Sequence, residues 1–256
     1  SRASVINLDL SGSNNTGVYF GNAGTNPFNL NNYTLNINGN DNTGVYIANG
    51  IVNLGTGKAN AINIASGSGN IGIFAAAAGD ALSTAANITV NADSSSGIFA
   101  QNTGTVTNTG NISASGASVK AIIADKTTVN STGNITVNGT ALSALDGSAG
   151  LVAQNGGTLN ITGGTTNITV DGSASTGLYA GTGSTLNLTG GTVTTTGGAF
   201  NVFSNGTVNL ANTTIDTGAS SLAFMAGTGG RILFNSTTAT ISGGSNTPAT
   251  RGTAFL

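Results

Sequence analysis

Residues 97–114 of the chain read GIFAQNTGTVTNTGNISA. This stretch contains three short runs, at residues 97–100, 105–107 and 111–114, that carry β-branched and aromatic residues, which are enriched in strands. Asn, Thr and Gly separate the runs, and Asn and Gly favour tight turns. The stretch therefore predicts three short strands joined by turns.

The same unit recurs along the chain. Its first strand, called the anchor here, reads Gly-aliphatic-aromatic-Ala in its clearest copies. The anchors occupy residues 17–20, 44–47, 72–75, 97–100, 121–124, 150–153, 177–180, 199–202 and 223–226, the last two being degenerate copies. Successive anchors lie 22 to 29 residues apart, and a Thr-apolar-Asn/Thr strand and a third strand follow. Self-similarity at such a period is the sequence signature of a solenoid.

Three strands and three turns in each repeat predict an all-β fold, a right-handed parallel β-helix of about nine coils of 22–29 residues. Each strand would pair in parallel with its copies in the neighbouring coils. Val, Ile, Leu and Ala would fill a narrow core, while Gly and Asn would supply the corners that need positive φ. Helical repeats are excluded because Glu is absent and other helix formers are scarce, and no leucine-rich spacing is present.

We expect one β-helix domain over residues 1–256, without a linker. Residues 5–8 read as the second strand of a coil, and residues 254–256 as the start of a tenth anchor. These interrupted coils predict a segment of a longer rod that continues into further coils at both ends. No apolar run reaches the roughly 18 residues of a spanning helix, so we expect no membrane insertion by this segment.

The composition bears on whole classes of function. The chain has no Cys, His or Glu, which excludes zinc fingers, haem and Fe–S ligation, and nucleophiles paired with His. Six Lys plus Arg against eight Asp cannot form the basic surface that nucleic acid requires. We therefore expect no cofactor, no metal and no nucleic-acid partner.

The candidate binding site is a stripe on the anchor strands. Period-2 alternation places the second and fourth anchor residues inside and the third outside. The outward residues of successive anchors are Tyr19, Tyr46, Phe74, Phe99, Ile123, Val152, Tyr179, Asn201 and Met225. In register they would form an apolar, partly aromatic row that offers contact area to a sugar or a partner protein. The alternative is stacking between coils with no ligand.

Other repeated residues have simpler interpretations. A column of Thr105, Thr128, Thr158, Thr185 and Thr207 resembles the flat arrays of ice-binding solenoids, but its partner column is mostly Asn and the coil lengths vary. Side-chain hydrogen-bond ladders explain the column better. Asn-x-Ser/Thr triplets such as Asn87-Ile88-Thr89 and Asn134-Ile135-Thr136 are formal glycosylation acceptors, but this composition produces them by chance and we assign them no function.

The Asp residues are the test of an enzyme hypothesis. Asp41, Asp93 and Asp146 precede anchors by three or four residues, in alternate coils. Two coils span roughly 10 Å, which is too wide for a retaining carboxylate pair and marginal for an inverting one. The other Asp residues fall at scattered repeat positions, where backbone hydrogen bonding in turns explains them. We therefore expect no enzymatic activity.

The succession of Gly-aliphatic-aromatic-Ala, Asn-Thr-Gly and TVTNTGNI at residues 105–112 resembles the passenger repeats of large Gram-negative autotransporter adhesins, notably those of fusobacteria. The resemblance implies a right-handed β-helix displayed outside the outer membrane, anchored through a region not in this chain. It also implies a glycan or protein ligand on a host or partner cell. Two alternatives stay open: a purely structural spacer or fibre repeat, and a carbohydrate-processing β-helix.

Overall fold

The computed structural model describes residues 6–21, 27–55, 60–76, 81–140, 149–172, 175–218, 221–241 and 253–255. Within these residues the chain is all β: it forms 29 strands and no helix. The strands assemble into three parallel sheets of ten, ten and nine strands, and each sheet takes every third strand of the chain. The part of the chain that is described therefore contains no helix that could cross a membrane.

The first sheet, called the anchor sheet, contains β2 (Thr16–Phe20), β5 (Thr43–Ile47), β8 (Ile71–Ala75), β11 (Ser96–Gln101), β14 (Lys120–Asp125), β17 (Ala149–Gln154), β20 (Thr176–Ala180), β23 (Phe200–Ser204), β26 (Leu222–Ala226) and β29 (Thr253–Phe255). The second sheet contains β3 (Phe28–Leu30), β6 (Ile51–Leu54), β9 (Ala81–Thr84), β12 (Thr105–Asn108), β15 (Thr128–Ser131), β18 (Thr158–Ile161), β21 (Thr185–Thr189), β24 (Thr207–Ala211) and β27 (Arg231–Asn235). The third sheet contains β1 (Ile6–Leu10), β4 (Tyr33–Ile37), β7 (Ala61–Ile64), β10 (Asn87–Val90), β13 (Ile112–Ala117), β16 (Ile135–Thr140), β19 (Thr166–Asp171), β22 (Thr192–Thr196), β25 (Thr214–Thr217) and β28 (Thr238–Ile241).

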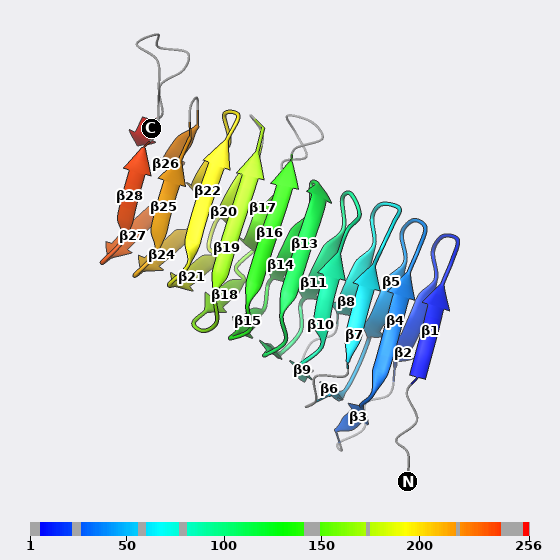
Figure 1. Ribbon diagram of the computed structural model, residues 1–256. Helices are drawn as coiled ribbons and strands as arrows, with labels where there is room; N and C mark the ends of the chain where they lie inside the picture. The colour runs from blue at the N-terminus through cyan, green and yellow to red at the C-terminus, as the bar shows by residue number, and fades with distance from the viewer. Residues whose placement is uncertain are drawn as a thin grey trace.

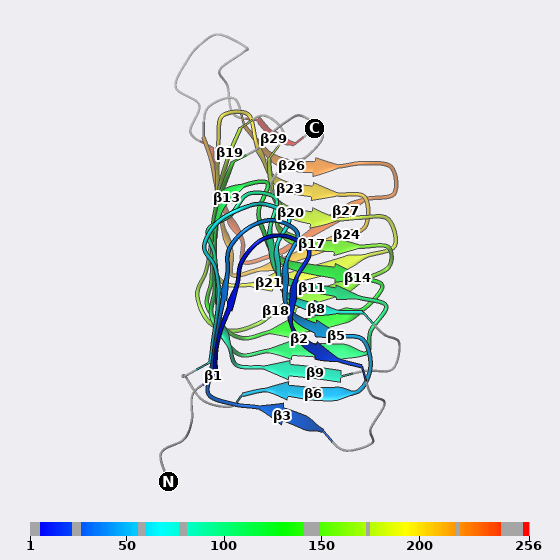
Figure 2. The same ribbon diagram turned by 90° about the vertical axis from the view of Figure 1, so that its right-hand side faces the viewer.

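This arrangement is a parallel β-helix, and the predicted fold class is confirmed. Strands of one sheet lie side by side in chain order, so the coils stack from the blue N-terminal end to the red C-terminal end of the rod (Figure 1). The view turned by 90° shows the anchor strands stacked in the same order, from β2 to β26 (Figure 2). The right-handed sense of the coil stays a prediction.

Two details of the predicted strand assignment are wrong, and one at the C-terminal end is confirmed. β1 pairs with β4 in the third sheet, so it is not the second strand of its coil. The anchor near residue 200 is displaced by two residues, because Leu178 pairs with Val202 and Tyr179 with Phe203. At the C-terminal end β29 pairs with β26, as expected for another anchor.

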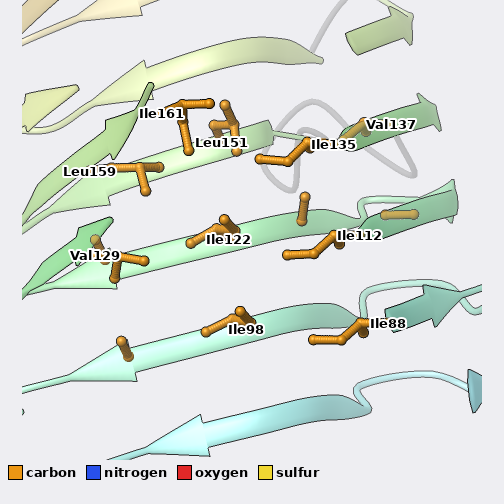
Figure 3. Close-up of a cluster of buried hydrophobic side chains, with 14 of the residues drawn as sticks. Ile88, Ile98, Ile112, Ile122, Val129, Ile135, Val137, Leu151, Leu159 and Ile161 are labelled. Atoms are coloured by element: carbon orange, nitrogen blue, oxygen red, sulfur yellow. The ribbon is translucent and has the colours of Figure 1, made fainter. Parts of the chain in front are cut away.

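The core consists of in-register columns of aliphatic side chains. Figure 3 shows the central part, where the anchor-sheet residues Ile98, Ile122 and Leu151 follow one another from coil to coil. Ile88 and Ile112 on the third sheet continue the same cluster. All five side chains are almost completely buried. Stacking therefore gives each short strand the apolar contacts that a single coil lacks.

The glycine of the anchor motif is explained by a close approach between coils. A Cβ on Gly72 would lie 2.6 Å from the carbonyl oxygen of Gly97 in the next coil, and one on Gly44 would lie 2.7 Å from that of Gly72. Contacts this short are repulsive, so these coils require glycine there. Ala121 and Asn201 occupy the same column in other coils, and the backbone accommodates a side chain at those levels.

The corners between the third and anchor sheets use left-handed backbone, as predicted, although Asp and Ser occupy some of them in place of the predicted Gly and Asn. Asn14, Asp41, Ser94 and Ser118 have φ between 51° and 60°, and Gly69 has φ of 69°. Their N–H groups donate to the carbonyl oxygens of the following coil, so the corner itself forms a ladder. Short polar residues tolerate this conformation better than β-branched ones.

Candidate functional site: an aromatic stripe on the anchor sheet

The predicted stripe exists as a row of residues in register. Tyr19 pairs with Tyr46 on β2 and β5, Tyr46 with Phe74, and Phe74 with Phe99 on β8 and β11. Ile123, Val152, Tyr179 and Met225 continue the row along β14, β17, β20 and β26. Parallel pairing without slippage therefore brings together residues that lie 22 to 29 positions apart in the chain.

Four aromatic rings form a continuous ladder at the N-terminal end of the stripe. The ring centroids of Tyr46 and Phe74 are 5.1 Å apart with an interplanar angle of 11°, and those of Phe74 and Phe99 are also 5.1 Å apart, with an angle of 24°. Tyr19 meets Tyr46 edge-on at 5.4 Å. Stacked neighbours cover one another's faces, and the rings of Tyr46, Phe74 and Phe99 are only partly exposed, whereas Tyr19 is 62% exposed. The ladder thus presents mainly ring edges to the outside.

A second aromatic group lies nearer the C-terminal end, and part of it was missed. Phe203, not Asn201, occupies the stripe position on β23, with its ring centroid 5.7 Å from that of Tyr179. Phe200 adds a further ring 6.0 Å from Phe203. The sequence signal was present in the pair Val202-Phe203, which matches the Leu178-Tyr179 of the preceding anchor.

Two stripe residues do not behave as predicted. Val152 has the right register but is only 4% exposed, so the outward surface is interrupted between the two aromatic groups. Asn201 is buried, because it occupies the column of the anchor glycine, where Gly177 lies one coil earlier.

The Asn201 amide is fully used inside the coil stack. Its Oδ1 accepts from the hydroxyls of Thr195 at 2.8 Å and Thr217 at 2.7 Å. Its Nδ2 donates to the carbonyl oxygens of Val193 at 2.7 Å and Asp216 at 3.0 Å. A buried amide with all its partners is a stable structural element, whereas losing one partner would leave polar groups stranded in the core.

The Asn column on the second sheet forms a side-chain hydrogen-bond ladder, as expected, and the Thr column beside it is in register. Thr105, Thr128, Thr158, Thr185 and Thr207 are in register. Beside them the Nδ2 group of each Asn donates to the Oδ1 atom of the Asn one coil earlier: Asn160 to Asn130 at 2.7 Å, Asn187 to Asn160 at 2.6 Å and Asn209 to Asn187 at 2.5 Å. These bonds stabilise the stacking of the coils. They also leave fewer groups free for a ligand.

The carboxylates are spread along the rod. Asp93 pairs with Ser68, and its side chain accepts a hydrogen bond from the N–H of Ala117. Asp41 occupies the next position of the repeat, which is the left-handed corner residue. The two carboxylates therefore do not stand at equivalent positions of the repeat. Asp80 and Asp146 lie outside the described residues. Among the described residues no three Asp side chains gather into a possible metal site.

Asp125 is the buried carboxylate of the described chain, and amides surround it. It is 5% exposed and stands at the end of β14, in register with Gln101 and Gln154. Its oxygens accept bonds from the side-chain amides of Gln154 and Asn155 at 3.0 Å and of Gln101 at 3.4 Å. The donors come from the coils on either side, so the cluster joins three coils. These hydrogen bonds explain Asp125 as a structural cross-link between coils.

Comparison with known proteins adds no family to this geometry. No protein-family model, no curated protein and no solved structure matches the chain.

Proposed function

We propose that this chain is a non-catalytic part of a bacterial cell-surface adhesin of the autotransporter-passenger kind, held outside the cell through a region beyond this chain. Its binding surface is the aromatic stripe. The observation that supports this most directly is the ladder of Tyr46, Phe74 and Phe99, whose rings stay partly exposed. Exposed apolar rows are uncommon on monomeric proteins and often mark interaction sites.

The ring geometry favours one class of partner. A sugar binds an aromatic side chain by lying on the face of its ring, and the faces of Phe74 are covered by Tyr46 and Phe99. Only Tyr19, at the end of the ladder, has a ring exposed enough for such stacking. A row of ring edges instead matches the apolar surface of a partner protein, where aromatic contact area contributes affinity. We therefore propose a protein ligand on the host or partner cell.

An attachment assay tests this proposal. Beads coated with the chain are counted on epithelial cells and on co-resident bacteria, with Phe74→Ser and Phe99→Ser introduced together. The matched control is Ile51→Ser with Leu233→Ser, because these are exposed apolar residues of the second sheet. We expect the first pair to lower attachment at least tenfold and the second pair to leave it unchanged, while circular dichroism shows the same β content for both.

The assay also separates the alternatives. Protease treatment of the target cells should abolish attachment, and an excess of soluble oligosaccharide should not. No attachment by the unsubstituted chain would favour the spacer function, and attachment that survives loss of Phe74 and Phe99 would mean that the stripe is not the binding surface. Inhibition by oligosaccharide would show a glycan ligand.

A further inference from the structure

The chain contains five Asn-Gly dipeptides, and the fold holds them in different ways. An asparagine that precedes glycine is prone to deamidation, because a residue without a Cβ lets its nitrogen reach the carboxamide before it. The dipeptides begin at Asn38, Asn49, Asn138, Asn155 and Asn205. Reaction requires the glycine nitrogen to lose its proton and turn toward the asparagine side chain, so the hydrogen bonds of each dipeptide decide whether it can react.

Two of the dipeptides are held through their main chain. Asn138 and Gly139 lie inside β16, which pairs with a strand on each side, so the sheet keeps their backbone extended. The N–H of Gly206 donates to the carbonyl oxygen of Ala180 at 3.1 Å, which directs the nitrogen away from the carboxamide of Asn205. We therefore expect both dipeptides to be protected in the folded chain.

A third dipeptide is held at both reacting groups. The N–H of Gly156 donates to Oγ of Ser184 at 3.0 Å, and Nδ2 of Asn155 donates to the buried carboxylate of Asp125, also at 3.0 Å. Neither the nucleophile nor the carboxamide can turn without losing a hydrogen bond. We expect this dipeptide to be protected as well.

Asn38 and Gly39 stand in the opposite situation. Asn38 is exposed and lies in the loop that joins β4 to β5, one of the row of loops along the upper edge of the rod (Figure 1). Among the described residues nothing accepts a hydrogen bond from the N–H of Gly39. The hydroxyl of Ser66 in the next coil donates to Oδ1 of Asn38 at 3.4 Å. The nucleophile is therefore free, and a donor faces the oxygen on which negative charge develops during the attack.

The fifth dipeptide, at Asn49, lies at a different corner, between β5 and β6, and lacks this arrangement. Asn49 is half-buried, and no side chain of the described residues donates to its carboxamide. Gly50 makes a polar interaction of its own. We therefore expect Asn49 to react more slowly than Asn38.

We propose that Asn38 is a site of spontaneous deamidation, at which the folded chain gains a carboxylate with time. The nitrogen of Gly39 forms a bond to Cγ of Asn38 and gives its proton to water, while the bond from Cγ to Nδ2 breaks and Nδ2 takes up a proton and leaves as ammonia. Water then opens the cyclic imide. Opening at one carbonyl gives aspartate with an ordinary main chain, and opening at the other gives isoaspartate, whose main chain runs through the side chain. This proposal is independent of the function of the stripe.

The corner has no room for the longer main chain of isoaspartate. A Cβ on Gly39 would overlap the carbonyl oxygen of Gly12 in the preceding coil. The N–H of Asn40 donates to that same oxygen at 3.1 Å, and Nδ2 of Asn70 donates to the carbonyl oxygen of Gly39 at 2.7 Å. An extra atom in the main chain would shift Gly39 out of this stack and break these bonds. We therefore expect the isoaspartyl form to be less stable than a chain with ordinary aspartate at this position.

The test compares the five dipeptides within one sample. The folded chain is incubated in mildly alkaline buffer, and deamidation at each asparagine is followed over time by peptide mass spectrometry. Five synthetic peptides with the same local sequences give the rate of each dipeptide without the fold. Ser66→Ala removes the hydroxyl that contacts Asn38, and the matched control is Ser68→Ala, because the exposed hydroxyl of Ser68 lies at the same corner but contacts Asn40.

We expect Asn38 of the folded chain to deamidate at least tenfold faster than each of the other four asparagines, whereas the five peptides react at similar rates. A second asparagine that reacts as fast as Asn38 in the folded chain would overturn the proposal. So would a rate at Asn38 more than tenfold below that of its own peptide. Ser66→Ala should slow the reaction at least threefold and Ser68→Ala should leave it unchanged, and equal rates in the two variants would overturn the role given to Ser66.

The two products test the effect on the corner. The isoaspartyl form is separated from the aged sample by ion-exchange chromatography, and its thermal melt is compared with that of the Asn38→Asp variant, which has the same charge and an ordinary main chain. We expect the isoaspartyl form to melt at a lower temperature. Equal melting temperatures would show that the corner accommodates the longer link, and would overturn this part of the inference.

Discussion

Phe74 and Phe99 lie one above the other on β8 and β11, with their ring centroids 5.1 Å apart, although 25 positions separate them in the chain. The buried neighbours that precede them, Ile73 and Ile98, are paired in the same register. One pairing therefore creates two columns with different roles: an inward column that stabilises the fold and an outward column that is accessible to a ligand.

This difference predicts unequal costs for two adjacent truncations. Ile73→Ala removes a fully buried side chain and should lower the free energy of unfolding by about 2 to 5 kcal/mol. Phe74→Ala removes a partly exposed ring and its two stacking contacts, and should cost only about 1 kcal/mol. Urea denaturation followed by circular dichroism measures both. Equal losses would mean that Phe74 is a core residue rather than an accessible one.

The anchor glycine predicts a second contrast. In Gly72→Ala the new Cβ would lie 2.6 Å from the carbonyl oxygen of Gly97, and we expect a loss of about 1 to 3 kcal/mol from overpacking. Gly181→Ala is the control, because its Cβ would meet nothing closer than 3.5 Å and its φ is not in the left-handed region. That substitution should be neutral or stabilise the fold by up to about 1 kcal/mol, because alanine lowers the conformational entropy of the unfolded chain. A thermal melt of each variant distinguishes these outcomes.

The buried amide of Asn201 predicts a rescue experiment. Asn201→Gly restores the residue that other coils have at this position, yet it leaves the hydroxyls of Thr195 and Thr217 without their acceptor. We expect a loss of about 2 kcal/mol or more. Adding Thr195→Val and Thr217→Val removes the stranded hydroxyls and should recover most of the loss. If the single glycine variant is as stable as the parent chain, the network contributes nothing.

Tyr33 predicts a dependence on pH. Its hydroxyl on β4 is buried and has no hydrogen-bond partner among the described residues, and burial raises the pKa of Tyr33 above its ordinary value of about 10. The group is neutral in the folded state at a pH where the unfolded chain would already ionise. The contribution of the neutral Tyr33 side chain to the free energy of unfolding is therefore complete below a pH of about 10. It is lost as the pH rises further.

Tyr33→Phe tests this directly. The variant should lose the part of the alkaline destabilisation that Tyr33 causes, and at neutral pH it should gain about 1 kcal/mol because the unpaired hydroxyl is gone. Denaturation curves at pH values from neutral to strongly alkaline give both quantities. Tyr46→Phe is the control for loss of a tyrosine hydroxyl, because Tyr46 is only half-buried.

The repeat predicted the fold and the stripe residues of the clear anchor copies. Both follow from the alternation of inward and outward side chains within a single strand. Gly-Ile-Phe-Ala at residues 97–100 identifies a strand, its inward Ile98 and its outward Phe99 without reference to other coils. The prediction failed at Asn201, where a degenerate anchor allowed two alignments. Register there is decided by pairing with Leu178 and Tyr179, which the local sequence does not specify.

By itself, the sequence determined the kind of architecture. Short strands with little charge, separated by Gly and Asn turns at a recurrent spacing, can bury their apolar residues only by stacking coils. The tertiary structure decided which atoms remain available. Stacking covers the ring faces of Phe74 and joins Asn160 and Asn187 into a ladder. Availability depends on the coil above and the coil below, and these are distant in sequence and adjacent only in space.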